Sequence, residues 1–226
     1  MAAAQNNEIP MKLLLLGHRG ARAHRKVPQN SLSSFDLALR HGCDGFEFDV
    51  RKSSDGVAVI CHDPRWRGRT IAKTRALELG LPTLREVTER YRTGAFLDIE
   101  VKVPGLEEEV LAALRGNIPA EGYVISSFLP AVVKKLAGLD SNAPLGIICG
   151  NRSQLAAWRE LPVGYVIAEK ALADVKLVEE VHRAGKKIMI WTVNRAPTMQ
   201  RLAKAGVDGI ISDATERLVT TLGGIR

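Results

Sequence analysis

Short apolar runs alternate along the chain with longer stretches in which apolar residues recur every three or four positions. The short runs have the length of buried strands, and the longer stretches have the spacing of amphipathic helices. Eight strands are predicted, at residues 12–17, 45–51, 96–102, 123–128, 145–149, 165–168, 187–193 and 209–213. Eight helices are predicted to follow them, at residues 31–41, 84–91, 106–115, 129–137, 153–161, 175–184, 196–205 and 215–222.

This repeat of strand and helix predicts an α/β fold, a (β/α)8 TIM barrel. The alternative architecture is an open, doubly wound sheet. The number of units favours the barrel, as do the polar residues at the ends of the predicted strands, because functional groups of barrels gather at the C-terminal strand ends. We expect residues 1–10 to be a disordered tail and residues 11–226 to form a single barrel domain, since no linker interrupts the pattern.

A ninth strand, at residues 57–62, is predicted to return beside the second strand as a hairpin at the barrel mouth. Asp55 and Gly56 favour a two-residue turn, which needs positive φ at both central positions. This turn would pair Asp49 with His62. Because side chains alternate along a strand, one face would then carry Glu47, Asp49 and His62, and the other Phe46, Phe48, Val50, Val59 and Cys61.

Composition narrows the class of protein. A chain of 226 residues that is 46% hydrophobic can bury a sizeable core, and no apolar run reaches the length of a membrane span. The 3 cysteines (Cys43, Cys61 and Cys149) have no metal-ligand spacing. They indicate reduced thiols in a cytoplasmic protein.

The net charge of +7 is concentrated in a few segments, and residues 64–77 contain no acidic residue. These basic residues are either solvated loops or a positive rim that attracts an anionic substrate. A nucleic-acid partner is disfavoured, because aromatic content is only 5% and no stacking platform is visible.

Charged residues are predicted to point into the barrel from the third strand. Alternation sends Asp98, Glu100 and Lys102 inward and the apolar residues between them towards the helices. Buried charges are costly unless they are paired or bound to a metal. A salt bridge of Glu100 with Lys102 or Arg19 is one interpretation. Once Glu47 and Asp49 are added, the excess of carboxylates favours one hard divalent cation, Mg²⁺ or Ca²⁺.

Two histidines flank these carboxylates. His18 ends the first strand and His62 ends the returning arm of the hairpin, which suits a general acid and a general base. Arg19 and Lys102 offer the donors and positive charge that a phosphoryl group needs. Together with a metal, these residues predict hydrolysis of a phosphoester.

A series of short motifs runs through nearly the whole chain in a fixed order: His18-Arg19-Gly20, Pro28-Gln29-Asn30-Ser31, Glu47-Phe48-Asp49-Val50, Asp55-Gly56, His62-Asp63, Glu100-Val101-Lys102, Ser127-Phe128, Trp191-Thr192-Val193-Asn194 and Ser212-Asp213. In this order they resemble the glycerophosphodiester phosphodiesterases. The resemblance implies a barrel that cleaves a glycerophosphodiester to an alcohol and sn-glycerol 3-phosphate. It also implies roles for particular residues: a divalent metal on Glu47, Asp49 and Glu100, acid–base chemistry on His18 and His62, and phosphate contacts from Arg19 and Lys102.

The chain departs from that family in two places. Gln29 stands where the family has a glutamate, so a negative charge near Arg19 is lost; Asn30 beside it is expected to cap the following helix. The segment between Asp63 and Pro82 is short. It would form only a short cap and leave the alcohol end of the substrate open to solvent.

Several alternatives stay open at this point. Trp191 and Phe128 are either core aromatics or walls for the substrate's glycerol moiety. The leading hypothesis is a metal-dependent phosphodiesterase. The runner-up is a lysophospholipase D-type hydrolase, with the same chemistry on a lipid. A non-catalytic barrel that binds phosphodiesters is the third interpretation, and a barrel phosphohydrolase acting on monoesters is the least specific one. The expected partner is a small-molecule phosphodiester, with transient contact at a lipid surface allowed. The sequence does not set the oligomeric state.

Overall fold

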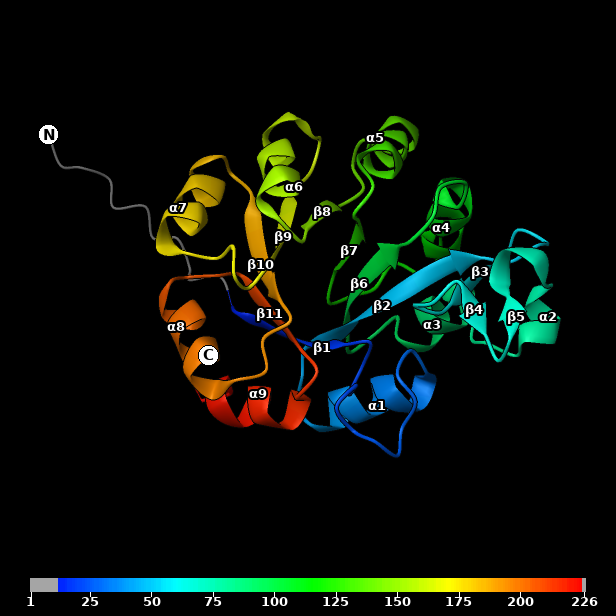
Figure 1. Ribbon diagram of the computed structural model, residues 1–226, viewed down its shortest axis with the longest axis horizontal. Coiled ribbons are helices and arrows are strands. Elements are labelled where there is room, and N and C mark those ends of the chain that lie inside the picture. The colour runs from blue at the N-terminus through cyan, green and yellow to red at the C-terminus, as the bar shows by residue number, and fades with distance from the viewer. Residues whose placement is uncertain (1–11, 225–226) are drawn as a thin grey trace, which may run out of the picture.

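Eight parallel strands form a closed ring in the computed structural model, which describes residues 12–224 (Figure 1). The strands are β1 (Leu14–His18), β2 (Gly45–Lys52), β6 (Phe96–Val101), β7 (Tyr123–Ser127), β8 (Leu145–Cys149), β9 (Tyr165–Glu169), β10 (Lys187–Trp191) and β11 (Gly209–Ser212). The ring closes because β1 pairs with both β11 and β2. The predicted barrel is therefore confirmed, whereas the tail proposed at residues 1–10 lies outside the described residues.

Helices surround the ring. They are α1 (Leu32–Arg40), α3 (Leu84–Arg90), α4 (Glu107–Leu114), α5 (Pro130–Leu139), α6 (Arg152–Ala156), α7 (Val175–Arg183), α8 (Ala196–Lys204) and α9 (Thr215–Leu222). The helix predicted at residues 153–161 is divided, because α6 passes into a 3-10 turn at Ala157–Glu160. None of the helices within residues 12–224 combines the length and the apolar character needed to cross a bilayer.

Apolar side chains fill two layers of the barrel. Since side chains alternate along each strand, one set faces the helices and the other fills the interior of the ring. The interior cluster draws on the strands alone and contains Leu16, Phe96, Val124, Ile148, Tyr165, Ile167, Met189 and Ile211. This cluster fills the barrel below the inward carboxylates of β2 and β6.

The strand that carries two of the inward carboxylates is held by aromatic packing. The ring of Phe35 on α1 stacks on Phe46 of β2 with centroids 4.2 Å apart, and Tyr91, at the end of α3, meets Phe46 edge-on at 4.9 Å. At the start of β2, Gly45 approaches β6 so closely that an added Cβ would lie 1.8 Å from the carbonyl oxygen of Phe96. These contacts fix β2 against α1 and the end of α3 on one side and against β6 at its start.

The hairpin at the mouth differs from the prediction by one residue. β3 (Ala58–Ile60) pairs antiparallel with β2 and lies outside the ring, but Val50 stands opposite Ile60 and not Cys61. The loop has three residues, because the amide of Gly56, at φ 83°, donates to the carbonyl of Ser53. A type I turn followed by a left-handed glycine is the usual three-residue hairpin loop. The expected two-residue turn is therefore wrong.

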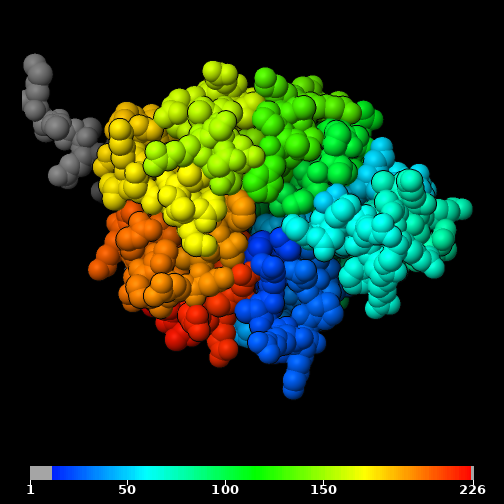
Figure 2. Space-filling view, in the orientation of Figure 1, coloured from blue at the N-terminus to red at the C-terminus, as the bar shows by residue number. Residues whose placement is uncertain are grey.

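A one-residue shift exchanges the faces of a strand. Val59 and Cys61, which were expected to share a face with Phe46 and Phe48, instead pack with Ile71 beneath the segment that follows. That segment, residues 64–81, is called the cap from here on. It stands out from the edge of the barrel in Figure 2.

The cap holds regular structure that the sequence pattern did not predict. It contains the two-stranded hairpin β4 (Arg65–Trp66) and β5 (Arg69–Thr70), a 3-10 turn at Ile71–Lys73 and the short helix α2 (Ala76–Leu79). Elements of two to four residues are too short to produce a recognisable hydrophobic period.

Candidate active site

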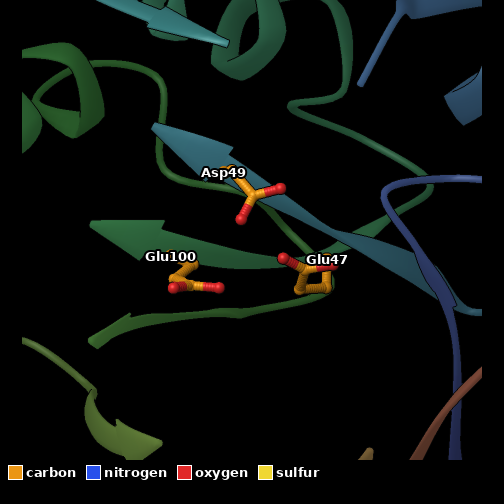
Figure 3. Close-up of side chains that lie close together, drawn as sticks. All are labelled: Glu47, Asp49 and Glu100. Carbon is orange, nitrogen blue, oxygen red and sulfur yellow. The ribbon is translucent and has the colours of Figure 1, made fainter. Parts of the chain in front are cut away.

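Three inward carboxylates meet at the C-terminal ends of β2 and β6. The two strands pair so that Asp49 lies beside Glu100. Glu47, Asp49 and Glu100 are all buried, and each offers an oxygen within 4.8 Å of the other two (Figure 3). The structure thus brings together the three residues that the sequence singled out as candidate metal ligands.

Burial makes negative charge costly in this cluster. It raises the pKa of Glu47 well above its usual value, and repulsion from Asp49 and Glu100 adds to the effect. Burial and the neighbouring Asp49 raise the pKa of Glu100 to about 7. Burial likewise raises the pKa of Asp98, the next inward carboxyl on β6, to about 7. Such a group of buried acids must bind either protons or cations at neutral pH.

Two basic side chains neutralise part of this charge. Lys102 Nζ lies 2.7 Å from Glu100 Oε1 and 3.2 Å from Asp49 Oδ1, and Arg19 Nε lies 3.1 Å from Asp49 Oδ2. Burial acts to raise the pKa of Asp49, but Lys102 and Arg19 outweigh it and the pKa is lowered. The internal salt bridge and the carboxylate cluster are therefore both present.

The oxygens of Glu47 are less well satisfied. Oε2 accepts a hydrogen bond of 2.9 Å from the backbone amide of Arg19. Oε1 is buried and has no hydrogen-bond partner within residues 12–224. A buried carboxylate oxygen without a donor, next to two other carboxylates, fits the all-oxygen coordination of a hard divalent cation.

The loop after β1 is shaped around these acids by two residues at positive φ. Arg19 has φ 53° and Asn30 has φ 55°, and the amide of Asn30 donates to the carbonyl of Arg19. The side chain of Asn30 then donates to Asp49 Oδ2 at 2.8 Å. The expectation that Asn30 caps the next helix is wrong, since the N-cap of α1 is Ser31, whose hydroxyl accepts from the amide of Ser34.

Gln29 lies between two arginines. Its Oε1 accepts from Arg19 Nη1 at 3.1 Å and from Arg22 Nε at 2.9 Å. The neutral amide keeps the hydrogen bonds that a glutamate could make. Unlike a glutamate, it does not neutralise the positive charge of either arginine at the rim of the site.

His18 is held by an aspartate from the opposite end of the chain. Its Nδ1 lies 2.7 Å from Asp213 Oδ1, and its Nε2 lies 3.8 Å from Glu47 Oε2. Asp213 is itself held by Asn194, whose amide donates to Oδ2 at 2.7 Å. Burial lowers the pKa of His18, although the hydrogen bond with Asp213 opposes this. The sequence motifs contained Asp213 and Asn194 but gave them no role.

His62 has a similar partner nearer to the surface. Its Nδ1 lies 2.8 Å from Asp63 Oδ1, and Arg51 Nε donates to its carbonyl at 2.7 Å. Burial lowers the pKa of His62 in spite of Asp63. β3 ends at Ile60, and the chain bends at His62. This bend, and not the predicted strand pairing of His62 with Asp49, brings the His62 side chain to the carboxylates.

Both histidines line one cavity of about 130 Å³, together with Arg19, Glu47, Glu100 and Lys102. The aromatic wall of this cavity is formed by Phe128 and Trp191, whose rings meet edge to face at 5.6 Å. Trp191 Nε1 donates to the carbonyl of Ile167 at 3.3 Å, which fixes the ring. Eight of the nine residues of the predicted site line this cavity: His18, Arg19, Glu47, His62, Glu100, Lys102, Phe128 and Trp191. The ninth, Asp49, is fully buried behind the cavity wall and pairs with Arg19 and Lys102.

Comparison with known proteins gives a consistent result. The family model described as the glycerophosphoryl diester phosphodiesterase family matches residues 18–121 and 119–217. A glycerophosphodiester phosphodiesterase of Caldanaerobacter subterraneus is 30% identical, over 92% of this chain and 97% of that protein. A glycerophosphodiester phosphodiesterase of Bacillus subtilis is 26% identical, over 94% of this chain and 87% of that protein.

Solved structures are similar over the same length. A phosphodiesterase of Oleispira antarctica, in complex with the product sn-glycerol-3-phosphate, has a TM-score of 0.81 and 25% identity, covering 93% of this chain and 96% of that one. A putative glycerophosphoryl diester phosphodiesterase of Silicibacter pomeroyi has a TM-score of 0.85 and 22% identity, covering 96% of this chain and 95% of that one. The second likeness supports the fold alone.

Proposed function

The chain belongs to the glycerophosphoryl diester phosphodiesterase family and is an enzyme of this type, and from this premise we propose that it hydrolyses glycerophosphodiesters to an alcohol and sn-glycerol 3-phosphate with the help of one divalent cation. One observation carries the proposal: Glu47, Asp49 and Glu100 converge within 4.8 Å, and two of them, Glu47 and Glu100, line the cavity that both histidines also line. The product bound by the Oleispira antarctica phosphodiesterase supports the choice of product.

The cation would be held by the carboxylates of Glu47, Asp49 and Glu100. The unpartnered Oε1 of Glu47 supports this assignment, and the all-oxygen donor set favours Mg²⁺ or Ca²⁺. When bound, such a cation supplies positive charge that draws electron density from the phosphoryl group. Lys102 and Arg19 stand beside the same carboxylates and would bind the remaining phosphoryl oxygens, which orients the phosphorus for attack.

The two histidines would move the protons. In the net reaction a P–O bond forms to the oxygen of water, and the P–O bond to the alcohol breaks. One histidine, neutral before the reaction, accepts the proton of the attacking O–H group, and the other, protonated, donates a proton to the departing alkoxide. In each ring Nδ1 faces an aspartate, Asp213 for His18 and Asp63 for His62. The Nε2 atoms are therefore the ones available to the substrate.

The walls of the cavity would receive the glycerol moiety. Phe128 and Trp191 offer an apolar surface against which a three-carbon chain can pack, and Lys102 Nζ lies 5.7 Å from the centroid of the Phe128 ring. These two aromatic residues would thus orient the substrate without taking part in proton transfer.

A turnover screen tests this function. Protein stripped of metal is incubated with glycerophosphodiesters, with lysophospholipids and with an aryl phosphodiester, each with and without added Mg²⁺ or Ca²⁺. We expect the glycerophosphodiesters to give the highest kcat/KM, and only when metal is present. Higher kcat/KM for lysophospholipids would favour the lysophospholipase D-type reaction, and full activity in metal-free protein would refute the role of the cation.

A further inference from the structure

A second cavity lies under the cap, on the far side of His62. It measures about 210 Å³ and is bounded by the loop at residues 28–31 and by Trp66, Arg67 and Leu81 of the cap. Within residues 12–224, His62 is the one residue that lines both this cavity and the carboxylate cavity. The second cavity, called the cap pocket from here on, therefore adjoins the carboxylate cavity at His62.

The cap pocket is also linked to the residues that surround the phosphate position. Gln29 and Asn30 form part of its wall. Gln29 holds Arg19, and Asn30 donates to Asp49. A phosphodiester has two arms on one phosphorus. If the glycerol arm occupies the carboxylate cavity, as the proposed function requires, the cap pocket is the adjoining space for the second arm, and His62 then stands beside the oxygen that leaves.

Arg67 is the unusual residue of this pocket. Arg67 and Gly68 are the two central residues of the β4–β5 turn, with φ 46° and 82°. A two-residue turn with both φ angles positive favours asparagine, aspartate or glycine at its first position, and a long side chain there is strained. Arg67 therefore stands at a position whose positive φ favours asparagine, aspartate or glycine.

The other arginines of the cap hairpin are used within the cap, whereas Arg67 faces the pocket. Arg65 donates to the carbonyl of Gly68, and Arg69 pairs with Glu78. The guanidinium of Arg67 lies 5.3 Å from the centroid of the Trp66 ring and forms no ion pair with any carboxylate in the described part of the chain. Its N–H groups also donate no hydrogen bond to any of residues 12–224, so they are available to a ligand.

We propose that the cap pocket binds the leaving alcohol, and that Arg67 makes it selective for polyhydroxylated alcohols over alcohols that carry a quaternary ammonium. A guanidinium donates hydrogen bonds to hydroxyl groups and repels a cation. It also covers Trp66, the aromatic surface that would otherwise attract a quaternary ammonium. The carboxylate of Asp63, which also lines the pocket, is engaged with Nδ1 of His62.

The substitution Arg67→Asn tests this assignment without disturbing the turn. Asparagine followed by glycine is the favoured pair for such a turn, so the variant should fold with an unchanged or higher Tm while losing the guanidinium. Lys73→Gln is the matched control. It removes one positive charge from the same cap, and Lys73 does not line the pocket.

The measurement is kcat/KM, at a fixed ionic strength and with saturating metal, for glycerophosphoinositol and for glycerophosphocholine. We expect the wild type to prefer the inositol ester, and Arg67→Asn to lower this preference about tenfold, the size of one hydrogen bond from a charged donor. Lys73→Gln should keep the wild-type preference.

The outcomes distinguish failure of the cap pocket from failure of the proposed function. An unchanged preference in Arg67→Asn, or an equal fall in both variants, would overturn the cap pocket while leaving the proposed function intact. A wild-type preference for the choline ester would overturn it as well. If the wild type hydrolysed neither ester, nor any other glycerophosphodiester, the proposed function would fail and the cap pocket with it.

Discussion

Nδ1 of His18 lies 2.7 Å from Oδ1 of Asp213, although 195 residues separate them in the chain. The contact arises because β1 and β11 pair side by side and both end at the barrel mouth. Asp213 also accepts from Arg22 Nη1 at 3.1 Å. The aspartate thereby fixes the tautomer in which Nδ1 carries the proton, and it directs Nε2 of His18 towards Glu47.

Asp213 is expected to act as a positioning residue for His18. In Asp213→Asn the amide can donate to Nδ1 and so favour the wrong tautomer, which should lower kcat at least about tenfold while KM changes little. The rate should be measured as a pH profile, because loss of the aspartate should also lower the apparent pKa of the histidine limb. An unshifted profile with normal kcat would show that the contact is only structural.

The same aspartate should contribute to stability in acid. Burial acts to raise the pKa of Asp213, but the hydrogen bond from His18, with that from Asn194, holds it below its usual range. The unfolded chain takes up the proton near pH 3.9. The stabilisation is therefore complete above that pH and is lost as the pH falls towards the lower folded pKa. The urea midpoint should drop more steeply between pH 5 and pH 3 in wild type than in Asp213→Asn; parallel curves would contradict this.

The three clustered carboxylates should each be needed for metal affinity. Glu47→Gln, Asp49→Asn and Glu100→Gln remove a charged ligand with little change in shape, and each should weaken binding of Mg²⁺ or Ca²⁺ by at least about tenfold, as measured by calorimetry. Asp98→Asn is the matched control. Asp98 is a buried inward carboxyl on β6, the strand of Glu100, but it is not a member of the carboxylate cluster. Equal losses in all four variants would point to a general electrostatic effect.

The two histidines should matter for turnover far more than for folding. His18→Ala and His62→Ala should each lower kcat about a hundredfold or more, the usual contribution of a general acid or base. Both side chains lie at the barrel mouth, so the unfolding transition should stay cooperative in each variant. His24→Ala, at an exposed position of the first loop, serves as the control. Near-normal kcat in either test variant would mean that its histidine has only a structural role.

The sequence predicts the barrel and its inward acids well because both depend on regular alternation. The bounds of all eight barrel strands agree within two residues, and Glu47, Asp49 and Glu100 point inward as the strand period requires. The register predicted for the hairpin is wrong by one residue. Hydrogen bonds of Ser53 to Asp55 and Val57 select a three-residue loop, and no periodic pattern encodes that choice.

The remaining features depend on long-range contacts or on very short elements. The partner of His18 comes from the far end of the chain, so only the pairing of β1 with β11 places Asp213 beside it. Asn30 looks like a helix cap in sequence, but its positive φ directs the side chain to Asp49 instead. In the sequence nothing distinguishes Arg67 from the other basic residues of its segment. Its position in a turn follows from the pairing of β4 with β5, and strands of two residues are too short to be predicted.

The most direct test of the central claim follows hydrolysis of a glycerophosphodiester by 31P NMR. Protein stripped of metal should leave the diester resonance unchanged. Addition of Mg²⁺ or Ca²⁺ should convert it to sn-glycerol 3-phosphate, and Glu47→Gln should show no such recovery at the same metal concentration. Conversion at the full rate without metal, or no conversion of the diester after metal is restored, would contradict a phosphodiesterase built on Glu47, Asp49 and Glu100.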